Sequence, residues 1–113
     1  MASGLSKRTI DGHVEPMILA VLSAGPSYGY EIGRDLLRRS DGLLKLGEGT
    51  LYPVLHRLEG RGLIAATWRT GPNGRDRKYY RLTPRGRRAI AEHQDQWTKL
   101  VAVMQAVTRP QPG

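Results

Sequence analysis

The segment of residues 63–83 constrains the fold more than any other part of the sequence, because its pattern is that of a β-hairpin. Residues 63–69 (LIAATWR) and 77–83 (RKYYRLT) favour strands, and the intervening TGPNGRD carries the glycine, proline and asparagine typical of a hairpin tip. A two-stranded hairpin is only marginally stable in water. It must therefore pack against helices, and the sequence predicts a mainly helical α+β chain with a small β-hairpin.

Three helical patterns precede the hairpin. Residues 13–24 repeat apolar side chains at steps of three and four, and a second helix follows Ser27, which we expect to cap it. The third pattern spans residues 47–63 (GEGTLYPVLHRLEGRGL). Because Pro53 has no N–H and its ring collides with the preceding turn, we expect this helix either to begin near residues 49–51 or to kink at the proline.

The outer face of the third helix carries side chains that are unusual for plain solvated surface. Opposite its apolar side we place Pro53, His56, Arg57 and Gly60, with Thr50 near the start of this face and Tyr52 on its flank. Small or flat residues permit close approach to a partner, the Tyr52 hydroxyl and helix-terminal N–H groups bind phosphate oxygens, and His56 and Arg57 reach base edges or backbone. The alternative is that this face is ordinary solvated surface.

The positive charge of the chain is concentrated in one segment. Residues 57–88 hold ten Arg or Lys and two acidic residues, a net charge of +8, whereas the other residues hold eight basic and eight acidic groups. This distribution favours a polyanionic partner. The alternative is that the cationic surface only keeps the protein soluble.

The predicted order of elements, three helices followed by a basic hairpin, is that of a winged helix-turn-helix. In such domains the third helix enters the DNA major groove, and the hairpin, or wing, contacts phosphates or the adjacent minor groove. We predict this DNA-binding domain over residues 11–83, after a flexible tail at residues 1–10. Thr83 followed by Pro84 predicts a final helix over residues 84–108, and the RPQPG ending predicts a flexible tail at residues 109–113.

The final helix ends in an apolar stripe that a small winged domain has little core to bury. Its members are Trp97, Leu100, Val101, Met104 and Val107. A second copy of the chain would bury the stripe, so the sequence predicts a homodimer in which this helix packs against the partner's first or last helix. Two recognition helices about 34 Å apart would then read an inverted repeat in the DNA.

Between residues 13 and 91 the sequence resembles the PadR-type transcriptional regulators, through GPSYGYEI, GEGTLYPVLHRLEGRGLI and GRDRKYYRLTPRGR in this order. The resemblance implies a winged-helix homodimer that usually represses transcription. It implies that Thr50, Tyr52, Pro53 and His56 lie on the recognition helix, and that the wing region contains Gly74, Arg75, Arg77 and Lys78. The tyrosines of the YY pair, Tyr79 and Tyr80, are interpreted as mainly structural.

Trp97 raises a separate hypothesis. Its position in the last helix is similar to that of a tryptophan which some short PadR-like multidrug sensors place at the dimer centre, where paired indoles stack flat aromatic drugs. A small aromatic effector is therefore a candidate partner. The alternative is that Trp97 only packs in the interface, as tryptophans at helical spacing commonly do.

Several classes of function are disfavoured. The absence of cysteine excludes disulfides, thiolate zinc sites and cysteine nucleophiles, and it fits a cytoplasmic protein. No apolar run approaches the roughly 20 residues of a membrane span, and catalytic motifs are missing. We expect no enzyme activity, no cofactor, no metal site and no membrane partner. The sequence thus predicts a sequence-specific regulator that binds double-stranded DNA, with an RNA-binding or protein-interacting winged helix as the alternatives.

Overall fold

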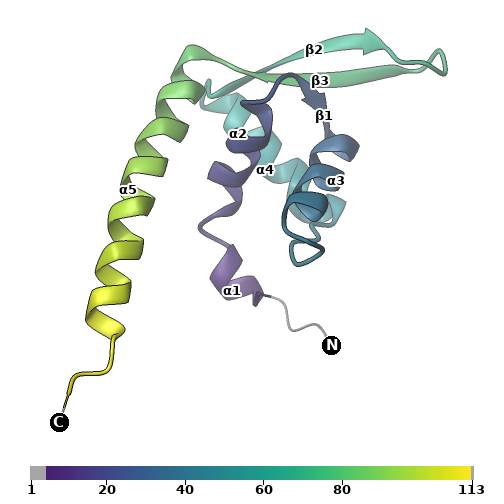
Figure 1. Ribbon diagram of the computed structural model, residues 1–113. Coiled ribbons are helices and arrows are strands. Elements are labelled where there is room, and N and C mark those ends of the chain that lie inside the picture. The colour runs from purple at the N-terminus through teal and green to yellow at the C-terminus, as the bar shows by residue number, and fades with distance from the viewer. Residues whose placement is uncertain (1–4, 113) are drawn as a thin grey trace.

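The structure is a computed structural model that describes residues 5–112. In chain order its elements are α1 (Lys7–Ile10), α2 (Val14–Leu22), β1 (Ser27–Tyr28), α3 (Gly29–Arg39), α4 (Glu48–Gly60), β2 (Ile64–Thr70), β3 (Asp76–Leu82) and α5 (Pro84–Thr108). Figure 1 shows α2, α3 and α4 gathered beneath the sheet, the β2–β3 hairpin projecting past them, and α5 running along one side. The predicted mainly helical fold with a small β-hairpin is confirmed.

The core forms where α2, α3 and α4 meet the base of the hairpin. Its most deeply buried large side chains are Ile18, Leu22, Ile32, Leu55, Leu58 and Ile64. They come from three helices and one strand, so the hairpin gains stability by packing on the helices, as its small size requires. Tyr80 and Leu82 of β3 join this core, as their shared face of the strand predicts.

Strand β1 is the main departure from the predicted fold. In the described part of the chain it adds a third strand to the sheet, in the antiparallel order β1-β3-β2, with Ser27 paired to Tyr80 and Tyr28 to Tyr79. The prediction that Ser27 caps a helix is therefore wrong, because α3 begins at Gly29 with Tyr28 at the N-cap position. A two-residue strand has no alternation to detect, and its partner lies about fifty residues further along the chain.

The N-terminal region also differs from the prediction. Within the predicted tail of residues 1–10, Lys7–Ile10 form α1, and the Ser6 side chain accepts a hydrogen bond from the Thr9 amide at 3.1 Å. Ile10 packs against the core. The helix is a single turn, which is too short for a periodic pattern in the sequence, and residues 1–4 of the predicted tail lie outside the described residues.

Helix α4 begins slightly earlier than predicted and contains its proline. Gly47 is the N-cap residue and the helix starts at Glu48, so Pro53 lies in the second turn. A proline at this position removes one hydrogen bond to the carbonyl of Gly49. Gly49 is exposed, so water can satisfy that carbonyl and the helix continues to Gly60.

The predicted start of α5 is confirmed by its capping geometry. The Thr83 hydroxyl accepts a hydrogen bond from the Gly86 amide at 3.1 Å and donates one to the carbonyl of Gly62 at 2.7 Å. These bonds join the first turn of α5 to the end of α4. The helix is 25 residues long, yet no helix of the described residues is sufficiently long and apolar to cross a membrane.

Gly86 allows this close approach, which gives a first testable prediction. A Cβ atom at position 86 would overlap the backbone carbonyl oxygen of Leu63. Although alanine normally stabilises a helix relative to glycine, we expect Gly86→Ala to lower the free energy of unfolding by about 1–3 kcal/mol, because backbone must move. Thermal melting measures the effect. Among the described atoms none lies within 4 Å of a Cβ at Gly60, so Gly60→Ala is the matched control. An unchanged melting temperature in Gly86→Ala would contradict the packing of α5 described here.

Candidate nucleic-acid interface

The residues expected on the outer face of α4 lie on its exposed side. Leu51, Val54, Leu55 and Leu58 point into the core. The opposite side presents the exposed residues Thr50, Tyr52, Pro53, His56 and Arg57. All five residues are therefore accessible, and we call the surface that they form the α4 outer face.

Tyr52 connects the α4 outer face to the start of α3. A Cβ at Gly29 would lie 2.5 Å from the Tyr52 hydroxyl oxygen, so the tyrosine ring packs directly on the backbone there. Only glycine permits this contact without displacing the ring. Tyr52 is 43% exposed as a residue, and its hydroxyl lies beside the first residue of α3.

The two helices of the helix-turn-helix begin in different surroundings: residues 47–50 at the start of α4 are exposed, whereas Gly29, the first residue of α3, is buried beside Tyr52. Within residues 5–112, α1 and α5 are capped by the side chains of Ser6 and Thr83, whereas the N-cap residues of α3 and α4, Tyr28 and Gly47, make no side-chain capping hydrogen bond. The first amides of a helix have no partner inside it, and the helix dipole makes this end attractive to anions. The exposed start of α4 can therefore donate to phosphate oxygens.

The tip of the β2–β3 hairpin is an exposed turn that presents Arg75. Gly74 has a φ of 74°, a left-handed conformation that favours glycine, and the Gly71 amide donates to the Arg75 carbonyl at 2.6 Å. Arg75 itself is exposed. The turn thus holds one arginine beyond the body of the domain.

Arg77 lies on an aromatic ladder near the tip of the wing. Its guanidinium carbon is 4.5 Å from the centroid of the Tyr28 ring, the rings of Tyr28 and Tyr79 meet edge to face at 5.3 Å, and Arg69 lies 3.9 Å above Tyr79. Such cation–π contacts fix the arginine stems while the charge stays near the surface. The ladder ties the wing to β1, which is the strand that the sequence did not reveal.

Lys78 joins the wing to α4. Its ammonium lies 3.3 Å from a carboxylate oxygen of Glu59 and 5.5 Å from the centroid of the Tyr80 ring. The hydrogen bond to Glu59 is the main cause that raises the pKa of Lys78 above its ordinary value, and burial raises the pKa of the Tyr80 hydroxyl. Lys78, one of the four predicted wing residues, is thus held by an acidic partner within the domain.

Arg57 is also engaged by an acid, which the sequence analysis did not anticipate. Glu15, in the first turn of α2, accepts hydrogen bonds from Arg57 at 3.5 Å and from Arg61 at 2.6 Å. The partners are separated by 42 and 46 residues. No local pattern links Glu15 to these arginines, so only the tertiary structure shows the contact.

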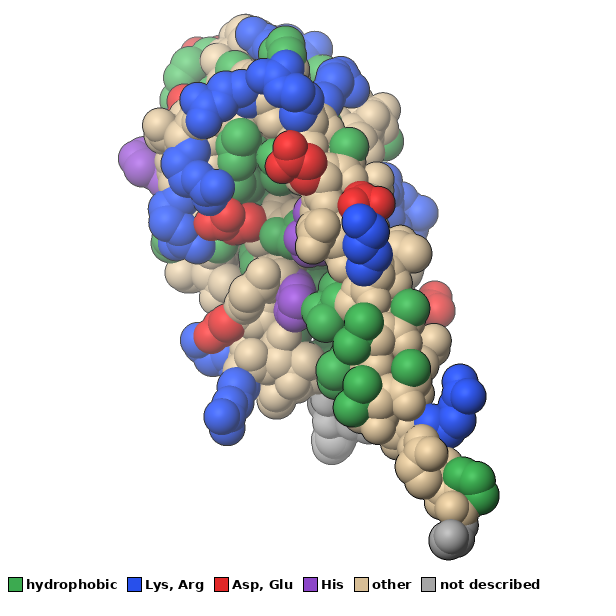
Figure 2. All heavy atoms as spheres, turned by 90° about the vertical axis from the view of Figure 1, so that its left-hand side faces the viewer, with side chains coloured by type: hydrophobic (Ala, Val, Ile, Leu, Met, Phe, Trp, Pro, Cys, Tyr) green, Lys and Arg blue, Asp and Glu red, His purple; other side chains and the backbone are tan. Residues whose placement is uncertain are grey.

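The basic segment of residues 57–88 folds into one end of the molecule. It comprises the last turn of α4, the hairpin and the first turn of α5. Figure 2 shows Lys and Arg side chains gathered over the upper part of the molecule, whereas hydrophobic side chains cluster along the lower part of α5. The charge asymmetry of the sequence is therefore also an asymmetry of the folded surface.

The second half of α5 exposes an apolar stripe. Leu100, Met104 and Val107 are 47%, 54% and 74% exposed, and Val101 is half-buried. Soluble monomers rarely expose contiguous apolar patches of this kind. We call these four residues the α5 stripe.

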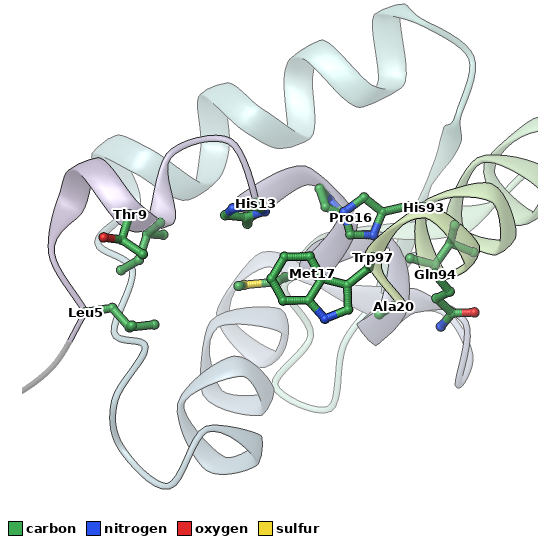
Figure 3. A pocket seen from close by; sticks show the side chains of 11 residues that line it. Leu5, Thr9, His13, Pro16, Met17, Ala20, His93, Gln94 and Trp97 are labelled. Carbon is green, nitrogen blue, oxygen red and sulfur yellow. The ribbon is translucent and has the colours of Figure 1, made fainter. Parts of the chain in front are cut away.

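Trp97 lies where the α5 stripe meets the domain. It lines a cavity of about 430 Å³ between α1, α2 and α5, whose other walls include Ile10, Met17 and Ile90. The ring of His13 meets the indole edge-on at 5.3 Å, and that of His93 stacks beside it at 6.2 Å. Figure 3 shows the indole among side chains from all three helices. The cavity is mostly apolar and open at one side.

Comparison with known proteins gives consistent results. The transcriptional regulator PadR-like family matches residues 18–92. An uncharacterized protein of Lysinibacillus sphaericus is 33% identical over 95 residues, which cover 84% of this chain and 87% of that protein. A transcriptional regulator from Clostridium thermocellum superposes with a TM-score of 0.82 at 33% identity, covering 91% of this chain and 100% of the other. A PadR-like transcriptional regulator from Bacillus cereus gives a TM-score of 0.81 at 27% identity, with 93% and 100% covered.

Proposed function

Because this chain belongs to the PadR-like family of transcriptional regulators, which implies DNA binding and not an enzyme, we propose that it is a sequence-specific repressor acting as a homodimer on an inverted repeat. The observation that carries the proposal is the exposed α4 outer face beside an arginine-bearing wing. The two surfaces suit a major groove and its flanking phosphates.

In the proposed complex each part of the surface has a separate task. The α4 outer face enters the major groove, where Thr50 and Pro53 permit close approach and His56 and Arg57 reach base edges or backbone. The Tyr52 hydroxyl and the first amides of α4 contact backbone phosphates. Arg75 and Arg77 of the wing contact further phosphates, which gives affinity and orientation without sequence preference.

The α5 stripe supports the proposed homodimer. Its apolar side chains face solvent in a single chain, and the contact that buries them most simply is the same helix or α2 of a second copy. Dimerisation would hold two α4 outer faces about one DNA turn, roughly 34 Å, apart. The two-fold symmetry of such a dimer is the reason why an inverted repeat is the expected target.

Selection of bound fragments from the native genome, followed by titration at several salt concentrations, tests the proposal. We expect an inverted-repeat operator that is preferred over random duplex by roughly 10³-fold or more, with a steep salt dependence. Equal affinity for structured RNA, or no nucleic-acid binding at low salt, would contradict it.

The cavity beside Trp97 supports a proposed effector site for a small aromatic molecule. Its volume lies within the range of ligand pockets, and indole and imidazole rings line it. A ligand there would contact α5, which is also the proposed dimer arm. It would release DNA only by favouring one separation of the two recognition helices over another.

Replacing Trp97 by alanine tests the effector site. We expect the winged domain to remain folded while affinity for a planar aromatic dye such as acridine falls about tenfold, because a stacking surface is lost. Dye fluorescence measures binding, and sedimentation reports whether the dimer also loosens. Trp68 is exposed on β2, so Trp68→Phe is the control that should leave dye binding unchanged. If Trp97→Ala altered neither dimerisation nor dye affinity, Trp97 would be ordinary surface.

A further inference from the structure

We propose that Glu15 clamps Arg57 and Arg61 and thereby limits the affinity of the protein for DNA of any sequence. The inference rests on the proposed function, because it requires the α4 outer face to meet DNA. It adds an acidic residue of α2 to a surface that the sequence describes only through its basic residues.

The geometry of the clamp uses both oxygens of one carboxylate. Oε1 of Glu15 accepts from Nη1 of Arg61 at 2.6 Å, and Oε2 accepts from Nε of Arg57 at 3.5 Å. The arginines are four residues apart at the end of α4, so they project from the same side of the helix. One carboxylate therefore restrains two guanidinium groups at once.

The exposure of the three side chains suits competition with a phosphate. Both arginine side chains are 58% exposed, whereas that of Glu15 is 30% exposed. An incoming phosphate can reach the guanidinium groups, but it must share or replace the carboxylate. Asp11 lies just before α2, and its carboxylate is already paired with the Lys7 ammonium, with Oδ2 2.9 Å from Nζ. Glu15 is thus the acid that neutralises these arginines.

The clamp acts on the part of the affinity that comes from phosphate contacts. Such binding depends on the number of cations that replace counterions on the DNA, and the trio carries one net positive charge where two unpaired arginines would carry two. Because phosphate contacts carry no sequence information, the clamp lowers the affinity for the operator and for random duplex by a similar factor.

Glu15→Gln tests this proposal because it removes the charge and keeps the size of the side chain. The probe is a random-sequence duplex of about 21 bp, titrated between about 50 and 200 mM salt. For a dimer with two clamps we expect the slope of log affinity against log salt concentration to become steeper by about 2. We expect the affinity at low salt to rise about tenfold. Asp95→Asn is the matched control, since it makes the same charge change and releases Lys99 on the far part of α5.

The possible results separate the inference from the proposed function. No binding of the wild-type protein to the duplex at low salt would overturn the proposed function itself. Two results would overturn only the clamp, provided that the wild type binds the duplex. One is an identical salt dependence of affinity in Glu15→Gln and Asp95→Asn, and the other is a lower affinity of Glu15→Gln than of the wild type. In a background carrying Arg57→Gln and Arg61→Gln, the Glu15 substitution should give no gain, and a persisting gain would also overturn it. Thermal melting verifies that each variant is folded.

Discussion

Replacing Leu100 and Met104 together by glutamate is expected to convert the proposed dimer into a monomer and to reduce affinity for the operator by about 10²- to 10⁴-fold. The two side chains are 47% and 54% exposed on the α5 stripe and lie one helical turn apart. In a dimer that buries the stripe, four carboxylates would lose water without gaining cationic partners. A monomer reads one half-site and loses the effective concentration that the second half-site provides.

The measurement combines sedimentation with titration of the operator found by genomic selection. Ala102→Glu with Ala106→Glu is the matched control, because it adds the same charges at the same spacing on the opposite side of α5. This control should remain dimeric and bind normally. If the stripe variant stayed dimeric, the subunits would have to meet elsewhere, and the proposed role of the α5 stripe would be wrong.

Replacing Arg75 and Arg77 together by alanine is expected to weaken binding to all duplex sequences by about 100-fold and to lower the salt slope by about 3 to 4. The dimer would lose four phosphate contacts, each of which accounts for about 0.9 of the slope. Both arginines belong to the wing. Arg75 projects from its tip, whereas Arg77 is restrained by its contact with the Tyr28 ring.

The expected signature is a uniform loss, since phosphate contacts carry no sequence information. Titrating the operator and a random duplex in parallel should therefore give similar fold-changes. Lys99→Ala with Arg109→Ala removes the same charge from the far end of α5 and serves as the control. Equal behaviour of the two double variants would show that net charge, and not the wing, governs affinity.

The secondary structure that matters for DNA binding was largely predictable from the sequence. The apolar spacing of α4, the glycine of the wing tip at Gly74 and the Thr83–Pro84 start of α5 all depend on residues close together in the chain. The same holds for the α4 outer face, because helical geometry converts sequence positions directly into directions.

The contacts between elements were not predictable in the same way. Strand β1 pairs with a strand far along the chain, Lys78 reaches Glu59 on another element, and Tyr52 packs on the backbone at Gly29. Nothing in the neighbourhood of Ser27 distinguishes a short strand from a helix cap. Each of these contacts depends on how whole helices and strands meet, and no local pattern encodes that.

The sequence by itself determined that this chain presents an exposed helix face, a basic hairpin and an apolar terminal stripe, because periodicity, turn chemistry and charge are properties of neighbouring residues. The tertiary structure alone decided which basic side chains of α4 and the hairpin are engaged by distant acids. Arg57 and Arg61 are restrained by Glu15 across 42 and 46 residues, while Arg75 projects freely from the turn. These two ion pairs join residues far apart in the chain, so it is the packing of α2 against α4 that brings their charges together.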